Sequence, residues 1–542
     1  MKRAVSIIGA GPGGLASAML LANAGADVTI YERHGQVGGR SGTINGASPQ
    51  GRFHFDIGPT FFLYPRILSD IFAECGRSLE DSVELIRLGT HYDVLFEGGG
   101  RMTASSDIPS LQRSVAAISP QDAAAIPAFM AENRAKLEAF RPILEQPFSS
   151  WRDLLTPGML RALPLLRPTR SIEQDLKRFF SDPRVRLGFS FQSKYLGMSP
   201  YRCPSLFSIL AFMEYEFGIF HPRGGTVAVM SAMADAARRM GVRIQLNEPV
   251  RELLFEGRRV VGLRTDTGAK QADAVVLNAD FLRSMSKLVP DRLRNRWTDR
   301  KIARKKLSCS TFMLYLGIKG EMPETAHHTI FLSREYKQNF REINDGRAPP
   351  KVPSFYMQNA CVSDPALAPP GYSTLYVLVP VGHTREGGVE WNAAERARYR
   401  AVALKRLADA GLPDIEERIV FEKIVTPEDW ENDMDVHRGA VFNLAHSLPQ
   451  MLHLRPRNRF EDLDGVYLVG GGTHPGSGLP VIFEGARISA RLLAQDLGLK
   501  SVRTDMQWSE QPGSEQPGSG SAMAAFAESP FAEGPLADGN LH

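Results

Sequence analysis

Two glycine-rich stretches near opposite ends of the 542-residue chain contain residue types that could bring the backbone close to a ligand. The first, IIGAGPGGLAS, covers residues 7–17, and the second, GGGTHPGSGLPVIFEGARISA, covers residues 470–490. Each follows a short apolar run and leads into a segment of helical composition. Glycine permits tight turns, and the free N–H groups at a helix start attract negative charge. Both stretches therefore predict ligand contacts made by the backbone.

The first stretch has the spacing of a dinucleotide-binding turn. A strand is predicted at 4–8, a helix at 12–25 and a second strand at 27–31, which together make a Rossmann-like βαβ unit. Four residues complete the pattern: Gly9, Gly11, Gly14 and Glu32. The glycines let a pyrophosphate approach the helix start, and an acidic residue after the second strand binds ribose hydroxyls. The unit predicts an adenine dinucleotide, but NAD and FAD share this turn, and Arg33 leaves NADP open.

The segment after Glu32 distinguishes these cofactors. GQVGGRSGT at 35–43 and FDIGPTFF at 55–62 resemble two stretches of a large flavoprotein group that contains amine oxidases, carotenoid desaturases and Rab GDP-dissociation inhibitors. The resemblance implies that Arg40 lies near the FAD phosphates and that the glycine pair before it lets the chain pass close to the cofactor. It predicts FAD as the cofactor.

The second glycine-rich stretch fits the other end of the same cofactor. FAD is long, so its isoalloxazine ring needs a separate close approach of the backbone. VYLVGGG at 466–472 predicts a last buried parallel strand. The helix that follows would direct the positive end of its dipole toward the ring, where negative charge develops on reduction. The two distant turns are therefore predicted to share one ligand.

A more specific resemblance comes from GTHPGSGLP at 472–480, which is similar to the C-terminal signature of the bacterial and fungal phytoene desaturase family. GPTFFLYP near residue 60, HPRGGT at 221–226 and TPEDW at 426–430 agree with it, and the resemblance runs from residue 1 to about residue 498. It implies FAD contacts at the following residues: Gly9, Gly11, Gly14, Glu32, Gly39, Arg40, Gly58, Val250, Gly472, Thr473 and Pro480. The segment VIFEGAR after Pro480 departs from the small residues usual in the family, which concerns the substrate rather than the cofactor.

The resemblance implies removal of two hydrogens across a C–C bond of a long apolar polyene, with a hydride passing to flavin N5. We therefore expect an FAD-dependent oxidoreductase acting on CH–CH groups, a carotenoid desaturase for phytoene, with oxygen or a quinone as electron acceptor. His474 is the candidate for a catalytic residue, and capping of its own turn is the alternative role.

Other functions stay open at this point. They are a C30 desaturase for a diapophytoene- or squalene-type substrate, a carotenoid isomerase and an end-group oxygenase. An amine oxidase is disfavoured by the THPG-type signature. A prenyl-chain binding protein without redox chemistry is disfavoured by the intact set of predicted FAD residues.

The pattern along the chain predicts an α/β fold with a Rossmann-like, mostly parallel FAD-binding sheet, an interleaved β-sheet substrate domain and an inserted helical, membrane-facing region. The predicted ranges are 1–100, 221–300 and 455–500 for the FAD-binding domain, 101–220 for the helical insertion and 301–454 for the substrate-binding domain. Residues 501–542 contain SEQPGSEQPGSGSA and are predicted to form a disordered tail.

The composition argues for a cytoplasmic globular protein. Charged residues make up 23% of the chain and the net charge is only +4, so no nucleic-acid partner is expected. The four cysteines are scattered and form no CxxC pair, which predicts no metal site and suits a reducing compartment. No apolar run reaches the roughly 18 residues of a membrane-spanning helix.

Two segments predict peripheral attachment to a membrane, from which an oil-soluble substrate could enter. RLRNRWTDRKIARKK at 292–306 has eight basic residues and one acidic residue, and Trp297 is a ring suited to the lipid interface. A solvated charged helix is the alternative for this segment. WRDLLTPGMLRALPLLRPTR at 151–170 is apolar with interspersed arginines.

Overall fold

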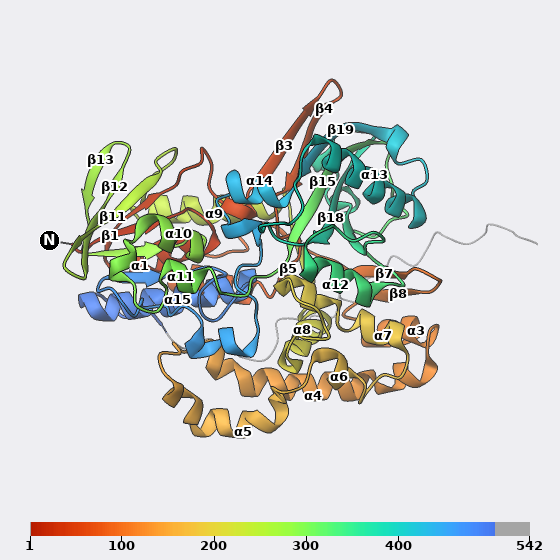
Figure 1. The fold of residues 1–542 in the computed structure, drawn as a ribbon, viewed down its shortest axis with the longest axis horizontal. Helices are drawn as coiled ribbons and strands as arrows, with labels where there is room; N and C mark the ends of the chain where they lie inside the picture. The colour runs from red at the N-terminus through yellow and green to blue at the C-terminus, as the bar shows by residue number, and fades with distance from the viewer. Residues whose placement is uncertain (1, 504–542) are drawn as a thin grey trace, which may run out of the picture. The chain divides into compact units, whose positions relative to one another are not determined.

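A five-stranded parallel sheet is the first layer of the computed structural model, which describes residues 2–503 (Figure 1). Its strands in spatial order are β10 (Arg243–Gln245), β2 (Asp27–Tyr31), β1 (Ala4–Ile8), β14 (Ala274–Leu277) and β20 (Val466–Leu468). All neighbouring pairs are parallel, with Ser6 beside Val275 and Val276 beside Tyr467. The predicted α/β class and its parallel sheet are confirmed. The carboxyl ends of β1, β14 and β20 therefore meet at one edge.

Helices cover this sheet because their buried faces consist of small and aliphatic residues. α1 (Pro12–Asn23) packs against both α9 (Thr226–Arg239) and α15 (Leu479–Leu497). Proline at the first position of α1 is well tolerated, because its missing N–H would have no helical partner there. Two further helices flank the sheet: α2 (Arg66–Glu74) and α10 (Phe281–Leu288).

The segment 242–253 contributes to two different strands. β10 ends at Gln245, and β11 (Val250–Glu256) begins after a turn in which Asn247 has φ +55°. Asparagine tolerates this left-handed conformation, and Pro249 cannot donate to a strand ladder. β11 then forms an antiparallel meander with β12 (Arg259–Thr265) and β13 (Gly268–Gln271).

A seven-stranded mixed sheet forms the second layer. Its strands in spatial order are β19 (Ile419–Val425), β15 (Ser310–Lys319), β18 (Tyr372–Val381), β17 (Phe355–Gln358), β16 (His328–Leu332), β7 (Tyr92–Phe96) and β8 (Arg101–Ala104). Associated helices are α12 (Tyr336–Asp345), α13 (Ala393–Asp409) and α14 (Pro427–Asn432). β15 and β18 are buried along almost their whole length, as expected for central strands of a covered sheet.

The boundary of this sheet differs from the predicted division of the chain. β7 lies in the range assigned to the FAD-binding domain, but it pairs in parallel with β16, with Asp93 beside Thr329. Its partner is so far along the chain that the local alternation of β7 could not identify it. The remaining short strands are β3 (Thr43–Ser48), β4 (Gly51–Asp56), β5 (Phe62–Leu63), β6 (Leu85–Arg87) and β9 (Ile219–Pro222).

The inserted region is helical, and Figure 1 shows it gathered on one side of both sheets in orange and yellow. Its helices are α3 (Ile108–Ala116), α4 (Pro120–Leu144), α5 (Pro157–Leu166), α6 (Ile172–Leu176), α7 (Pro183–Gly188) and α8 (Ile209–Phe217). Three 3₁₀ segments lie between these helices: η2 (Trp151–Leu155), η3 (Phe191–Leu196) and η4 (Ser205–Ser208).

The first three residues of the predicted tail, 501–503, belong to the fold. Val502 is buried and the Arg503 N–H donates to Glu74, so the fold continues to residue 503. The rest of the predicted tail lies outside the described residues.

A buried ion network holds α4 and α6 together. The Lys136 ammonium is fully buried and lies 2.7 Å from Asp175 Oδ2 and 3.1 Å from Glu132 Oε1. Arg167 and Arg178 also contact both carboxylates. Such a network costs desolvation free energy, so its partners depend on each other.

We therefore expect Lys136→Met to lower the free energy of unfolding of the helical region by about 3 kcal/mol, because it removes one partner of a buried charge pair. Urea denaturation followed by hydrogen exchange of the α4 amides measures this change. Lys177→Met is the control, because its pair with Glu173 is exposed and contributes less than about 1 kcal/mol. Equal effects of the two substitutions would contradict the assignment.

Candidate functional site

One cavity of about 780 Å³ runs between the parallel sheet, the seven-stranded sheet and the helical region. Both glycine turns lie on its wall. Of the residues predicted to contact the cofactor, those on the wall are Gly9, Gly11, Glu32, Gly39, Arg40, Gly58, Val250 and Pro480. The structure thus brings together residues from five distant segments of the chain.

The first turn leaves no room for side chains. A Cβ on Gly9, which has φ +96°, would lie 2.4 Å from the Asn278 carbonyl oxygen, and a Cβ on Gly14 would lie 2.1 Å from the Gly9 carbonyl oxygen. Gly14 therefore acts in packing and does not line the cavity. No side chain caps the start of α1, so N–H groups of its first turn are available to a ligand phosphate.

Glu32 is oriented by the backbone around it. Its carboxylate accepts hydrogen bonds from the Ala10 N–H (2.8 Å) and the His34 N–H (2.9 Å). The Glu248 N–H donates to the Glu32 carbonyl, which brings the start of β11 and Val250 to the same wall. A rigid carboxylate beside the first turn is suited to bind ribose hydroxyls.

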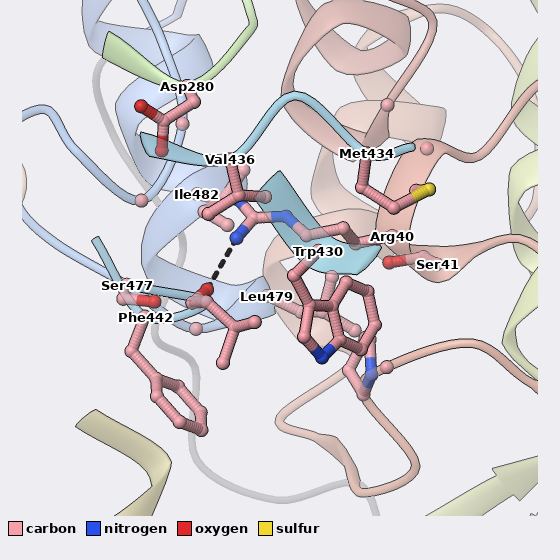
Figure 2. Close-up of a pocket in the computed structure, with 18 of the residues that line it drawn as sticks. Arg40, Ser41, Asp280, Trp430, Met434, Val436, Phe442, Ser477, Leu479 and Ile482 are labelled. Carbon is pink, nitrogen blue, oxygen red and sulfur yellow. Dashed lines mark hydrogen bonds between the residues drawn. The ribbon is translucent and has the colours of Figure 1, made fainter. Parts of the chain in front are cut away.

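Arg40 lies close to residues from much later in the chain, near positions 280 and 441. Figure 2 shows its guanidinium group near Asp280, and the dashed line marks its hydrogen bond to the Val441 carbonyl. Burial lowers the pKa of Arg40, while Asp280 opposes this shift. A Cβ on Gly58 would lie 2.9 Å from the Arg40 carbonyl oxygen, so this position requires glycine. The cation on the wall is suited to an anionic ligand group.

The second turn contacts the cavity only in part through the predicted residues, of which Pro480 lies on the wall. The wall includes Gly470, Gly471 and the start of α15 at Leu479–Ile482, but neither Gly472 nor Thr473. A Cβ on Gly472 would lie 2.9 Å from the Phe281 side chain, and the Thr473 carbonyl accepts a hydrogen bond from Arg455. Both residues hold the turn in place through contacts on the side away from the cavity.

His474 does not line the cavity. Its ring is buried, and Nε2 donates to the Gln146 carbonyl at 2.9 Å. Burial lowers the pKa of His474 to about 4, so the ring is neutral at physiological pH. This residue anchors the connection after α4 to the second turn.

The remainder of the cavity is largely apolar. Its walls come from η3, α8, β16 and β17 and include Phe61, Leu63, Phe191, Leu196, Leu210, Met213, Ile330, Leu332 and Phe355. Thr60 and Tyr356 share a hydrogen bond of 2.7 Å on the wall, and His328 Nδ1 lies 2.8 Å from the Tyr356 hydroxyl. An elongated hydrocarbon beside a few fixed polar groups fits such a space.

Several site residues could not be recognised in the sequence. Asn278 follows β14, and its side-chain amide donates to the Gly9 carbonyl at 3.1 Å. The only signal for it was its place at the carboxyl end of a predicted parallel strand, where ligands bind in such sheets. Tyr195 and Tyr356 reach the wall from the insertion and the second sheet, and no local motif marks them. Trp430 of α14 also reaches the wall; it ends the TPEDW stretch, which carried the resemblance without predicting a contact.

The residues present fit FAD. The turn before α1, the carboxylate of Glu32 and the cation of Arg40 match the adenosine and pyrophosphate, and the uncapped start of α15 matches a ring that becomes negative on reduction. The two glycine-rich turns lie at the two ends of the binding site and Arg40 lies between them, an arrangement that suits one extended ligand. Contacts of individual residues with the cofactor stay a prediction.

Comparisons with known proteins agree with this arrangement. The family model described as "Flavin containing amine oxidoreductase" matches residues 12–498. A 4,4'-diapophytoene desaturase (4,4'-diapolycopene-forming) of Methylomonas sp is 40% identical over 493 residues, which cover 91% of this chain and 95% of that protein. A phytoene desaturase (lycopene-forming) of Pseudescherichia vulneris is 34% identical over 499 residues, which cover 92% and 100%. An oxidoreductase structure from Methanosarcina mazei has a TM-score of 0.60 at 18% identity and covers 89% of this chain and 98% of its own. The resemblance predicted from the motifs and the flavin cofactor are confirmed.

We expect Glu32→Gln to raise the dissociation constant for FAD about 10- to 100-fold, because hydrogen bonds to a charged group contribute about 1.5–3 kcal/mol. Titration of the apoprotein with FAD, followed by flavin fluorescence, measures this constant. The control is Glu252→Gln, an exposed position on β11 that pairs with Arg264. If Glu32→Gln binds FAD as the unaltered protein does, the assigned role is wrong.

Proposed function

The chain belongs to the flavin containing amine oxidoreductase family, and we propose that it is an FAD-dependent carotenoid desaturase acting on phytoene or a similar long polyene. The observation that supports this most directly is the single cavity, in which a dinucleotide-binding end continues into an apolar space. The desaturases among the relatives match the chain over nearly its whole length, including the second turn and the helical insertion.

Bound FAD would supply the redox chemistry by taking up a hydride from the substrate. The protein aligns the substrate and keeps water away, and the apolar walls from α8, β16 and β17 suit both tasks. For the electron acceptor that completes the cycle, we propose oxygen or a quinone.

A C30 substrate is the second candidate. The relative with the higher identity of the two reported is named for 4,4'-diapophytoene, and the other is named for phytoene. The length of substrate that fits depends on where the apolar space ends. Sequence motifs do not specify the position of this end. The experiment below therefore offers both substrates.

We further propose that the protein attaches peripherally to a membrane through η2 and α5. Among residues 2–503, no helix combines the length and hydrophobicity that crossing a bilayer requires. The four most exposed large apolar side chains described are, however, all in this segment: Trp151, Leu155, Leu160 and Leu163, with 47–59% of their surface accessible. Such a patch suits the lipid interface.

A basic cavity beside this segment supports an anionic lipid as the partner. It has a volume of about 470 Å³, and five cations line it: Arg296, Lys301, Arg304, Lys305 and Lys306. Burial and the charges of Arg296 and Lys301 lower the pKa of Lys305, so an anion would relieve the repulsion. Arg296 also donates to the carbonyl of His453, whose ring interacts with Asp153 of η2, so the basic and apolar surfaces are neighbours.

Trp297 has a different role from the predicted one. Only 1% of its surface is exposed; its ring packs edge-on against Phe281 at 5.0 Å, and its N–H donates to Glu461. The tryptophan therefore anchors the basic segment to the core and cannot contact lipid. The burial of Trp297 could not be predicted from the charged residues around it, because buried and interfacial tryptophans occur in similar basic sequences.

We expect the protein to float with vesicles that contain phosphatidylglycerol, and less so at high salt. Leu160→Ser with Leu163→Ser should weaken binding about 100-fold, because each leucine contributes about 1.5 kcal/mol or more on burial. Val352→Ser with Val362→Ser, which changes exposed apolar residues elsewhere, is the control. Vesicle binding that is unaffected by the leucine substitutions would refute this surface.

The activity itself is tested by expression in bacterial hosts that produce either phytoene or 4,4'-diapophytoene. We expect a product with a longer conjugated system in at least one host, detected by chromatography and absorption, and its identity fixes the chain length. A purified protein with bound FAD that leaves both substrates unchanged would contradict the desaturase proposal. Coloured carotenoids would then be supplied to test isomerisation or end-group oxidation.

A further inference from the structure

Glu214 is a buried carboxyl group beside the apolar part of the main cavity. It belongs to α8 and has no exposed surface. Leu210 and Met213 of the same helix line the cavity, so this part of α8 forms its wall. A carboxyl group is costly to bury in such surroundings unless its charge or its proton has a use.

The contacts of Glu214 come from uncharged groups. Oε2 accepts hydrogen bonds from the Tyr92 hydroxyl (2.9 Å) and the Gln192 amide (3.0 Å), and the Tyr92 hydroxyl lies 3.0 Å from that of Tyr215. The cations of α4 near α8 are engaged elsewhere: Arg134 pairs with Glu216 and Lys136 pairs with Asp175. The carboxyl group is therefore held in place without a counter-ion.

Tyr195 connects Glu214 to the cavity. Tyr195 lines the cavity, and its ring centroid lies 5.2 Å from that of Phe61, which follows the stretch at Gly58–Thr60 on the same wall. Burial raises the pKa of Tyr195, and the neighbouring Glu214 carboxyl group raises it further. Within residues 2–503, the Tyr195 hydroxyl and Glu214 Oε1 are both buried without a hydrogen bond, so each has a free position for a proton beside the substrate space.

We propose that Glu214, acting through the Tyr195 hydroxyl, accepts the proton that the substrate loses during desaturation. This inference rests on the proposed function. FAD, held by the residues at the cofactor end of the cavity, would take up the hydride that leaves when one C–H bond of the substrate breaks with its electron pair. The C–H bond of the neighbouring carbon breaks, and its electron pair forms the new C=C bond. Its proton passes to the Tyr195 oxygen while the Tyr195 proton passes to the Glu214 carboxylate.

The charge states of the groups around Glu214 are suited to this transfer. Burial raises the pKa of Glu214 to about 7, so the carboxylate that accepts a proton forms near neutral pH and predominates above it. Burial likewise raises the pKa of Tyr92, Tyr195 and Tyr215, which keeps all three facing phenols protonated. Near the Tyr356 wall, burial keeps the pKa of His328 well below its usual range, so this histidine cannot retain a proton at neutral pH.

Stopped-flow measurement of flavin reduction by the substrate, in the holoenzyme with vesicles, tests the role of Glu214. Either phytoene or 4,4'-diapophytoene is used, whichever the unaltered protein converts. The rate should rise about tenfold from pH 6 to pH 8 and then level off, because the carboxylate is the active form. Glu214→Gln should lower the plateau about 10²- to 10⁴-fold and abolish this pH dependence.

Two further variants separate catalysis from structure. Glu216→Gln, two residues along α8 and paired with Arg134, should retain the rate and the pH profile. Tyr195→Phe should lower the rate at least about 100-fold while the carboxyl group remains. Infrared spectra of the holoenzyme should show a protonated carboxyl band that titrates near neutral pH and is absent from Glu214→Gln, a readout that needs no substrate.

The results distinguish this inference from the proposed function. If the unaltered protein reduces its flavin with neither polyene, the desaturase proposal fails and this inference fails with it. If it is active but Glu214→Gln or Tyr195→Phe keeps the full rate and pH profile, only the inference is overturned. If Glu214→Gln does not retain FAD, Tyr195→Phe decides by the same measurement.

Discussion

The close packing of three strand ends around Asn278 is the constraint on which the rest of the site depends. Its amide donates to the Gly9 carbonyl, and a Cβ on Gly13 would lie 2.3 Å from Val469 and 2.7 Å from Asn278 Oδ1. The turn after β1 and the strand end after β20 can approach only because Gly13 has no side chain. One extended dinucleotide can then be contacted by the backbone from both ends of the chain. The insertion and the second sheet are built outward from this point.

The charged groups suited to the cofactor and the apolar side chains of the cavity lie at opposite ends. The cofactor end of the cavity has fixed charges, Glu32 and Arg40, each oriented by backbone atoms. The substrate end has tyrosines, a threonine and Lys194 among hydrocarbon side chains, and burial lowers the pKa of Lys194 to about 8. Water and mobile charges would destabilise the alignment of a hydrocarbon, so neutral hydroxyl groups held by neighbours are suited to this end. The insertion and the second sheet supply this part together, with side chains from η3, α8, β16 and β17.

The sequence predicted those features that local residues determine. Strand, glycine turn, helix and acidic residue lie within the first 32 positions, and their geometry follows from steric rules that act over a few residues. It failed where the partner is distant. Nothing near Trp297 shows that Phe281 and Glu461 enclose it, and β7 contains no trace of its pairing with β16. For the same reason the motif at 472–480 was recognised and its Pro480 lies on the wall of the cavity, while Gly470 and Gly471, which also line it, were not predicted as contacts.

Three buried carboxyl groups of the helical insertion differ in the partners that surround them. Asp175 is surrounded by Lys136, Arg167 and Arg178, which stabilise its charge. Asp122 accepts hydrogen bonds from the N–H groups of residues 181 and 182 and from the Ser181 hydroxyl, so both of its oxygens have donors. Glu214 has only phenols and an amide, so burial dominates and its proton becomes labile near neutral pH. A group that served structure alone would be better stabilised by either of the other two arrangements. Glu214, which lacks such stabilisation, is the carboxyl group that lies beside the substrate space. This is the position that a proton acceptor for a hydrocarbon requires, because the carboxylate becomes neutral when it takes up the proton.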